Sequence, residues 1–292
     1  MLTGEGVNAG ISKTECDTAL VVKGEEVTLS SELYNNSGSA MEYQPFPAQA
    51  WQAGAHPWKG DGEKITIDMT KDAGMKRYID FQQKLIDEDL INTQVSNWSD
   101  EWNRSLNDGS IASLTIGAWM PVNLMNGAPD QTGNWRVAQL PQWKEGEEVF
   151  SDDGGSALAI TAQSHNQAAA YKFIEYMTLG KGAVTMSQTG NFPCLKSILD
   201  DPDFTNPESE ANKKVNAFFG GQNVSAVLAE AAKRPVGEFQ YLPYNAFAQT
   251  QFGDDISPAY NKKIKLEDAF RAYGKSLAEH GTQQGYDVTN EG

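Results

Sequence analysis

The chain has 292 residues and a mass of 31.9 kDa, which suits one large domain or two of ordinary size. Hydrophobic residues make up 39% of it, so a core can form and a wholly disordered chain is excluded. The formal charge of −16 repels phosphate backbones, and the basic residues form no patch, which argues against binding to nucleic acid. The chain contains 7 Trp, 10 Tyr and 12 Phe, which is many aromatic residues for a polar, acidic protein and therefore calls for an explanation.

The first part of the chain is poor in regular patterns. Residues 1–43 are rich in turn-forming side chains and predict an irregular N-terminal segment, with one strand-like run at 18–22. Residues 64–67 alternate as a short strand. Asp68 or Thr70 then caps a helix whose apolar residues recur every three to four positions.

The remaining elements alternate between helices and strands. The spacing of apolar residues predicts helices at 100–107, 167–178, 209–219, 224–233 and 265–279. Apolar runs predict buried strands at 112–118, 135–140 and 157–161. In the helix at 167–178 the side chains expected to face inward are Ala170, Phe173, Ile174 and Met177. The segment 235–258 is interpreted as turns that carry aromatic side chains, and the whole pattern predicts an α/β architecture.

Cysteine and hydropathy patterns are weak guides here. Cys16 and Cys194 could form one disulfide, but two unpaired thiols are the plainer interpretation, and the compartment stays open. No Cys/His cluster indicates a zinc site, and no apolar run of about 18 residues predicts a membrane span. The first ten residues lack the basic and apolar regions of a signal peptide.

Enzyme motifs are not found in a convincing form. Residues 154–158 depart from the Gly-x-Ser-x-Gly nucleophile elbow, and 180–182 lack the spacing of a phosphate-binding loop. Among 39 acidic residues, neighbours such as Asp152 and Asp153 are a weak signal for the paired carboxylates of a glycosidase. The acidic run 200–203 lacks the Gly and closing Glu of a calcium loop and favours a solvated turn.

The aromatic excess suits carbohydrate binding. Trp and Tyr rings cover the apolar C–H faces of a sugar, while carboxylates and amides accept its hydroxyl protons, and no positive charge is needed. Trp119 follows a predicted buried strand and a Gly, at the edge of a sheet where ligands collect in open α/β folds. A structural role in the core remains the alternative for each of the other Trp residues.

An ordered series of phrases then becomes recognisable. The phrases, in chain order, are QAWQAGA (49–55), WSDEW (98–102), LNDGSIA (106–112), IGAWM (116–120), GNWRVAQLPQW (133–143), GGSALAI (154–160) and AAAYKFIEYM (168–177). Together they resemble the extracellular solute-binding proteins of bacterial ABC sugar importers, the maltose-binding-like family. The segments FFGGQ (218–222), QFG (251–253) and GTQQGY (281–286) resemble the actinobacterial oligosaccharide-binding members of that family. The resemblance covers roughly residues 40–287.

The resemblance implies a periplasmic-binding-protein-like fold of two lobes. By analogy, 44–150 and 200–287 form a nearly complete second lobe, 153–198 are a remnant of the first, and 288–292 are a tail. Family members begin with a secretion signal, often with a lipobox cysteine, and a βαβ segment; this sequence shows neither, so a truncated first lobe is expected. A truncated chain should bind sugar far more weakly than a full-length relative, and the strand at 157–161 should expose unpaired edges.

The resemblance also implies a set of ligand-binding residues. Trp119 should stack on a sugar ring, and Asp153 and Gly154 should mark a hinge crossing, where close backbone approach favours Gly. The remaining residues of this expected set are Tyr43, Gln44, Phe46, Trp51, Tyr241 and Tyr244. Hinge packing or a core role stays open for each of these six.

The function implied is that of a monomeric, non-catalytic protein without a cofactor. It would bind a mono- or oligosaccharide between the lobes and deliver it to the membrane permease of an ABC importer. The full-length protein would then stand at the extracellular face of the membrane as a lipoprotein, or in the periplasm. The alternatives are a binding protein of the same fold for another solute such as a polyamine, and a glycoside-active enzyme.

Overall fold

The structure, a computed structural model, describes residues 19–22, 25–28, 36–37, 43, 45–93, 95–144, 146–234, 236 and 238–292. The chain divides into two compact units. Unit 1 contains Ile116–Gln139 and Gly154–Lys233, and unit 2 contains the described parts of Gly4–Thr115, Leu140–Asp153 and Arg234–Gly292. The predicted thiol Cys16 and the predicted site residue Gln44 lie outside the described residues.

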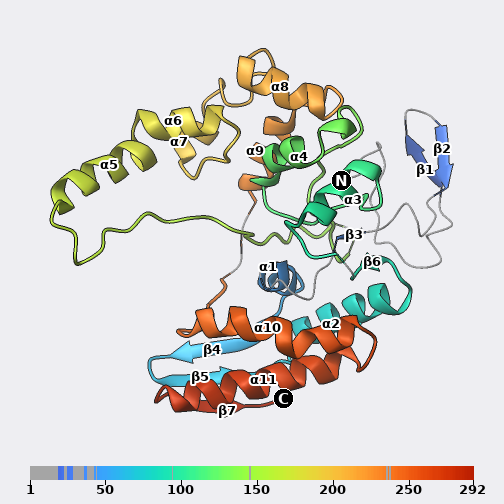
Figure 1. Ribbon diagram of the computed structural model, residues 1–292, viewed down its shortest axis with the longest axis vertical. Coiled ribbons are helices and arrows are strands. Elements are labelled where there is room, and N and C mark those ends of the chain that lie inside the picture. Colours follow the sequence, from blue (N-terminus) through green and yellow to red (C-terminus); the bar gives the residue numbers. More distant parts are fainter. Residues whose placement is uncertain are drawn as a thin grey trace. The chain divides into compact units, whose positions relative to one another are not determined.

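Unit 2 combines strands and helices (Figure 1). Its strands are β1 (Ala19–Val22), β2 (Glu25–Thr28), β3 (Asn36–Ser37), β4 (Trp58–Asp61), β5 (Lys64–Ile67), β6 (Ile91–Asn92) and β7 (Asp287–Asn290). Its helices are α1 (Pro45–Gln52), α2 (Ala73–Asp87), α3 (Asp100–Asp108), α10 (Asn245–Tyr260) and α11 (Leu266–Gln283). The predicted α/β class is confirmed, and the expected strands at 18–22 and 64–67 are present as β1 and β5.

A three-stranded sheet in the order β4-β5-β7 forms one layer of unit 2. β4 runs antiparallel to β5, and β7 runs parallel to β5, with Lys64 opposite Asp287. Alternation along β5 buries Ile65 and Ile67, because successive side chains of a strand point to opposite faces. Helix α11 packs against both β5 and β7.

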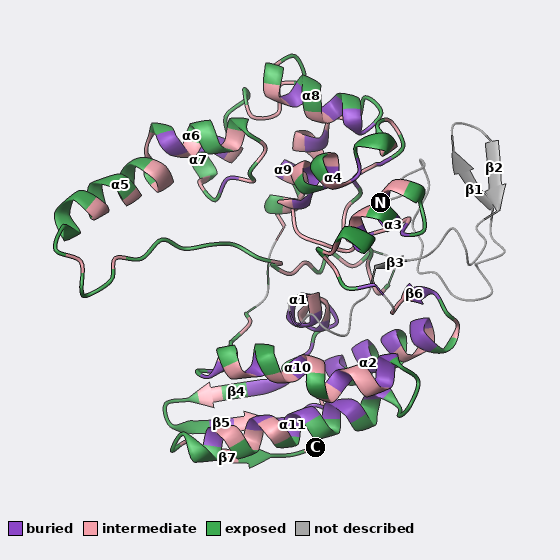
Figure 2. Ribbon diagram, in the orientation of Figure 1, coloured by how far each residue is buried: buried purple, intermediate pink, exposed green. Residues whose placement is uncertain are grey.

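Helices α2 and α11 follow the predicted amphipathic pattern. Each turns a buried stripe toward the core and an exposed face outward (Figure 2). The expected cap of α2 is wrong: Asp72, rather than Asp68 or Thr70, accepts the hydrogen bond from the Met75 N–H (2.8 Å). Asp68 accepts instead from the Lys71 N–H (2.8 Å), which forms a turn before the helix begins.

The core of unit 2 is centred on an aromatic cluster. The ring of Phe46 is stacked on Phe252 (5.2 Å between centroids) and lies 5.1 Å from Phe270. Tyr273 packs edge-on to Phe252, and its hydroxyl donates a hydrogen bond to the carbonyl oxygen of Ala248 (2.8 Å). Much of the aromatic excess therefore fills this core.

Unit 1 is helical. Its elements are α4 (Met120–Gly127), the short 3-10 helix η2 (Pro129–Gln131), α5 (Gln167–Leu179), α6 (Lys181–Gln188), α7 (Lys196–Leu199), α8 (Glu210–Phe218) and α9 (Val224–Ala232). The predicted helices at 167–178, 209–219 and 224–233 are present as α5, α8 and α9. The inward orientation expected for α5 is wrong, because none of its residues is buried (Figure 2). Phe173, for example, is 60% exposed.

Among the described residues, the three predicted strands do not form as regular strands. Residues 135–140 are extended, but the backbone N–H and C=O of Val137 bind the side-chain amide of Gln222, at 2.7 Å each. Residues 112–118 and 157–161 are also irregular, and 157–161 are mostly exposed. The prediction of turns over 235–258 is wrong for the second half of that segment, which forms α10. Pro258 lies in the last turn of this helix.

The predicted lobes and the observed units divide the chain differently. Residues 200–233, expected in the second lobe, belong to the same compact unit as most of 153–198. One crossing between units falls between Asp153 and Gly154. Gly154 and Gly155 both have positive φ, +114° and +95°, which a residue with a Cβ adopts only with strain.

Candidate functional site

An aromatic surface lies on unit 2. It consists of Trp51 on α1 together with Phe239 and Tyr241 from the segment that precedes α10. The rings of Trp51 and Phe239 are stacked at 5.0 Å between centroids, with 30° between their planes. Tyr241 lies edge-on to Phe239 at 5.2 Å and is 55% exposed. We call these three side chains the aromatic surface.

The segment that carries Phe239 and Tyr241 is fastened to β4. The side-chain oxygen of Gln240 accepts from the N–H of Gly60 (2.9 Å), and its amide nitrogen donates to the Gly60 carbonyl oxygen (3.0 Å). The indole N–H of Trp58 donates to the backbone carbonyl of Gln240. These contacts bind Gln240 to β4, so the irregular segment that carries its two aromatic neighbours is anchored to a strand.

Carboxylates lie beside this surface. The pKa of Tyr241 is raised above 10.0, first by burial, then by the charges of Asp153 and Asp152. Phenolate formation is opposed because negative charge is already close. The arrangement thus offers aromatic faces together with strong hydrogen-bond acceptors, which suits a ligand with apolar faces and hydroxyl or ammonium donors.

Trp119 belongs to unit 1. It precedes α4 as its N-cap residue, is half-buried, and accepts a hydrogen bond on its carbonyl oxygen from the Asn123 side chain (3.2 Å). A Cβ placed on Gly154 would lie 2.7 Å from the indole nitrogen of Trp119. The backbone of Gly154 therefore packs directly against the indole, so the structure brings these two predicted site residues together.

Three residues of the expected set are core residues of unit 2. Tyr43 is 5% exposed, and its hydroxyl donates to Asn245 Oδ1 (2.8 Å); burial raises its pKa. Phe46 is 1% exposed at the centre of the aromatic cluster. Tyr244 is 8% exposed, and burial followed by the neighbouring Tyr286 raises its pKa to about 12. In this structure these rings present almost no surface to a ligand.

Sequence reasoning did not include Phe239 or Asp152 in the site. The signal for Phe239 was its place two residues before Tyr241, since residues two apart in an extended segment point to the same side. No sequence pattern indicated that Asp152 lies near Tyr241, because 88 positions separate two segments that meet only in the folded chain.

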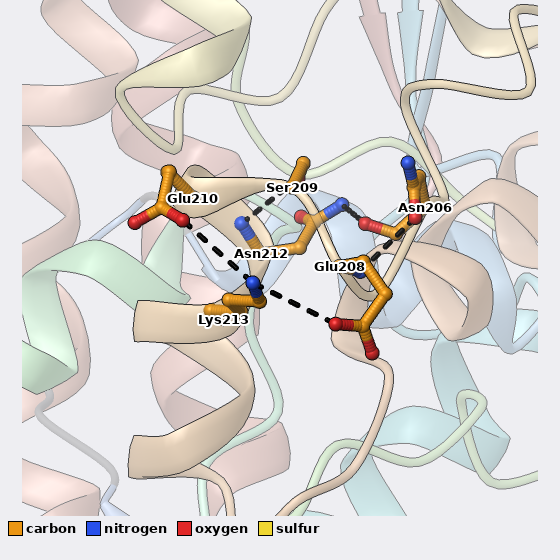
Figure 3. Close-up of polar contacts among 6 residues, drawn as sticks. All are labelled: Asn206, Glu208, Ser209, Glu210, Asn212 and Lys213. Carbon is orange, nitrogen blue, oxygen red and sulfur yellow. Dashed lines mark hydrogen bonds and ion pairs between the residues drawn. The ribbon is translucent and has the colours of Figure 1, made fainter.

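A polar network in unit 1 is the other concentration of charged and amide side chains (Figure 3). Asn212 on α8 is buried, and its amide donates to the carbonyl oxygens of Asn206 (2.8 Å) and Phe204 (2.9 Å). Lys213 lies 3.6 Å from Glu208 and 3.7 Å from Glu210, both exposed. The Lys213–Glu210 pair lies within α8, and the other contacts bind the 204–209 loop to this helix, which is a structural role.

The described residues contain neither a metal-binding cluster nor a membrane-spanning helix. Within the described residues no group of three or more His, Cys, Asp or Glu side chains could hold a metal ion. No helix of the described chain is long and apolar enough to cross a membrane. In the acidic run 200–203, the Asp201 carboxylate accepts from the Asp203 N–H (3.0 Å), which closes a turn.

Comparison with solved structures shows the fold. The chain superposes with a TM-score of 0.81 and 37% identity on the ABC transporter-associated binding protein of B. animalis subsp. lactis, solved in complex with β-1,6-galactobiose. That match covers 89% of this chain and 64% of the relative. The galacto-N-biose/lacto-N-biose I-binding protein of Bifidobacterium longum, solved with lacto-N-biose, matches at 22% identity with a TM-score of 0.71, over 88% and 61%. The chain therefore has the fold of these two-lobe binding proteins.

Curated relatives match over shorter stretches. The arabinooligosaccharide-binding protein of Halalkalibacterium halodurans is 26% identical over 162 residues, 53% of this chain and 35% of the relative. Its counterpart in Bacillus subtilis is 28% identical over 137 residues, 45% and 30%. The chain thus spans about a third of the length of these curated relatives. A family model described as bacterial extracellular solute-binding protein matches residues 14–183, more than half of the chain. This chain belongs to the bacterial extracellular solute-binding protein family.

Proposed function

We propose that this chain is the carbohydrate-binding component of an ABC sugar importer. It binds a mono- or oligosaccharide without changing it, and the full protein delivers the sugar to the membrane permease from the outer face of the membrane. The observation that carries the proposal is the aromatic surface of Trp51, Phe239 and Tyr241 beside Asp152 and Asp153. The relative solved with β-1,6-galactobiose supports it, at 37% identity.

The chemistry of this surface fits a neutral sugar. Stacked indole and phenyl rings cover the C–H face of a pyranose, and the exposed ring of Tyr241 extends that platform. Carboxylates accept hydroxyl protons, and such charge-assisted hydrogen bonds are stronger than neutral ones. The same carboxylates, with a net charge of −16, repel acidic sugars.

Within this proposal, Trp119 is a second stacking residue and Gly154 positions it. Asp153 and Gly154 lie at a crossing between the two units, where a hinge would let the protein close on its ligand. A sugar favours the closed form only by contacting it better than the open form. Tyr43, Phe46 and Tyr244 are placed outside the ligand-contacting set, since they are buried.

A ligand panel tests the proposal. Isothermal titration or ligand-observed NMR on the intact chain should detect binding of β-1,6-galactobiose, lacto-N-biose or an arabino-oligosaccharide. Trp51→Ala and Tyr241→Ala should each weaken that binding by about three- to tenfold, the usual contribution of one aromatic contact. Tyr171→Ala is the matched control, because Tyr171 is 61% exposed, lies on α5 and is not among the proposed ligand-contacting residues.

The two alternatives give different results in the same panel. A polyamine such as spermidine would be favoured by Asp152 and Asp153, and binding of spermidine but of no sugar would refute the carbohydrate proposal. Turnover of an aryl glycoside that is lost on Asp153→Asn would indicate an enzyme. If the chain unfolds cooperatively but binds none of the sugars, the carbohydrate proposal is also refuted.

A further inference from the structure

Trp98 differs from the other Trp residues in two ways. All seven are described, and Trp98 is the exposed one, with 46% of its surface accessible. Its φ is +66°, in the left-handed region that residues with bulky side chains rarely adopt. Two other described non-Gly residues have positive φ, Asp89 and Lys262, and both of these are polar.

Hydrogen bonds stabilise the turn that contains Trp98 and join it to α3. The Ser99 hydroxyl donates to the carbonyl oxygen of Ser96 (2.7 Å), and it accepts from the N–H of Trp102 (3.1 Å), which caps α3. The N–H of Ser99 also donates to the Ser96 carbonyl oxygen (3.3 Å). Trp98 therefore occupies the third position of a turn over residues 96–99, a position at which Gly or Asn is favoured when φ is positive.

A second indole supports the first. The ring of Trp98 lies 4.9 Å from that of Trp102, with 44° between the planes, and Trp102 is 2% exposed. One face of Trp98 is thus backed by a buried ring, while nearly half of its surface stays accessible. The side chain is held as a platform by the capped helix.

The geometry of the turn does not require a Trp at position 98. Gly or Asn would make the same turn without the strain of a left-handed Trp, and an exposed indole gains little from burial. Strained backbone persists where the surrounding structure over-determines it, and such positions cluster at functional sites. What Trp adds here is a flat, accessible aromatic face.

Two carboxylates that follow Trp98 closely in the chain supply further groups suited to a sugar. Asp100 and Glu101, in the first turn of α3, are both exposed carboxylates next to Trp98 in the chain. Carboxylates accept hydroxyl protons, while the indole covers the C–H face of a ring. This combination of groups is the same as at the aromatic surface, but on a different element of unit 2.

We propose that Trp98 is a second carbohydrate-stacking platform, which contacts a sugar unit of an oligosaccharide. The inference rests on the proposed function and extends it to a residue outside the aromatic surface. Trp98 contacts the ligand directly, and Trp102 acts as a positioning residue beneath it.

The first experiment replaces Trp98 by Asn, which the turn accepts. Trp98→Asn should bind β-1,6-galactobiose or a longer β-1,6-galacto-oligosaccharide about three- to tenfold more weakly than the parent chain. Trp98→Tyr keeps an aromatic face and should retain most of the affinity, whereas Tyr171→Ala should bind normally. A purely structural role predicts a changed unfolding midpoint in Trp98→Asn with unchanged affinity, and that result would overturn the proposal.

The second experiment needs no substitution and so does not depend on the variants folding. Trp98, as the exposed Trp, should be oxidised first by N-bromosuccinimide, and peptide mapping should show that saturating sugar slows its oxidation. Equal oxidation of Trp98 with and without sugar would refute the inference. If no sugar binds the parent chain at all, the proposed function falls and this inference with it; if sugar binds parent and Trp98→Asn equally, this inference alone falls.

Discussion

Replacing Gly154 by Ala should disturb both the backbone and Trp119. The new methyl group would lie 2.7 Å from the indole nitrogen of Trp119, closer than atoms in ordinary contact. The φ of +114° adds strain of about 1–3 kcal/mol for a residue with a Cβ. Moving the indole away from its preferred rotamer adds about 0.5–1.5 kcal/mol.

Gly155 provides the matched control. Its φ is +95°, but a Cβ placed on it meets nothing within 4 Å. Gly155→Ala should therefore bear the backbone strain alone. The difference between the two variants isolates the contact with Trp119, and we expect Gly154→Ala to be the less stable by about 0.5–1.5 kcal/mol.

Urea unfolding and sugar titration measure the two effects separately. Gly154→Ala should weaken sugar binding by up to about tenfold, because the displaced indole no longer stacks on the ring. Gly155→Ala should bind more tightly than Gly154→Ala. Equal stability and equal affinity of the two variants would refute the reasoning that Gly154 is small in order to admit the indole.

Three further substitutions test the electrostatics and the core. Tyr273→Phe removes the hydrogen bond to Ala248 and should lower the free energy of unfolding in urea by about 1–2 kcal/mol; an unchanged midpoint would contradict this. The hydrogen bond from Lys265 (3.1 Å) lowers the pKa of Asp87 below 3.8, so the pair stabilises the fold above that pH, and the contribution is lost as pH falls through the lowered pKa. Because both groups are exposed, Lys265→Met should cost at most about 0.5 kcal/mol near neutral pH and progressively less as the pH falls below 3.8, and a cost that does not change with pH would exclude an ionic contribution. Burial raises the pKa of Tyr244 from 10.0 to about 12. The neutral phenol therefore stabilises the fold below pH 10, and this contribution is lost as the pH rises through 12. In thermal melts across this pH range, the stability of Tyr244→Phe should fall less steeply than that of the parent chain.

Local sequence patterns were sufficient for most helices. The apolar stripes of α2 and α11 are encoded within a few residues, so the pattern predicts them. α10 was missed in part, and Pro258, which has no N–H to donate within a helix, lies inside its last turn. The cap of α2 differs from the expected one because Asp72, rather than Asp68 or Thr70, supplies it.

The strands could not be predicted from the same information. A strand exists only with a neighbour, and the sequence does not show which neighbour each run finds. Val137 pairs with the side chain of Gln222 rather than with another strand, and the apolar run at 157–161 pairs with no strand. The hydrogen-bonding partner, which lies far away in sequence, decides the outcome.

The candidate site shows the same limit. Trp51 and Tyr241 were selected by a family resemblance, and Trp119 was selected both by its place after a predicted strand and by the resemblance. Their role in binding stays a prediction. The stacking of Trp51 on Phe239 and the closeness of Tyr241 to Asp153 depend on contacts between distant segments. Burial separates Tyr43 and Phe46 from this group, and the sequence around them carries no signal of that difference.

The parallel pairing of β5 with β7 has a consequence for how the chain folds. Lys64 pairs with Asp287, and the described residues of unit 1 all lie between these two positions in the sequence. The sheet of unit 2 is therefore complete only when β7, near the C-terminus, pairs with β5. During synthesis the helices of unit 1 leave the ribosome before β7, α10 and α11 exist, and they can assemble first. Closing so long a loop is slow, which leaves Ile65 and Ile67 uncovered in the meantime. Nascent chains halted before α11 should therefore recruit chaperones far more than completed ones.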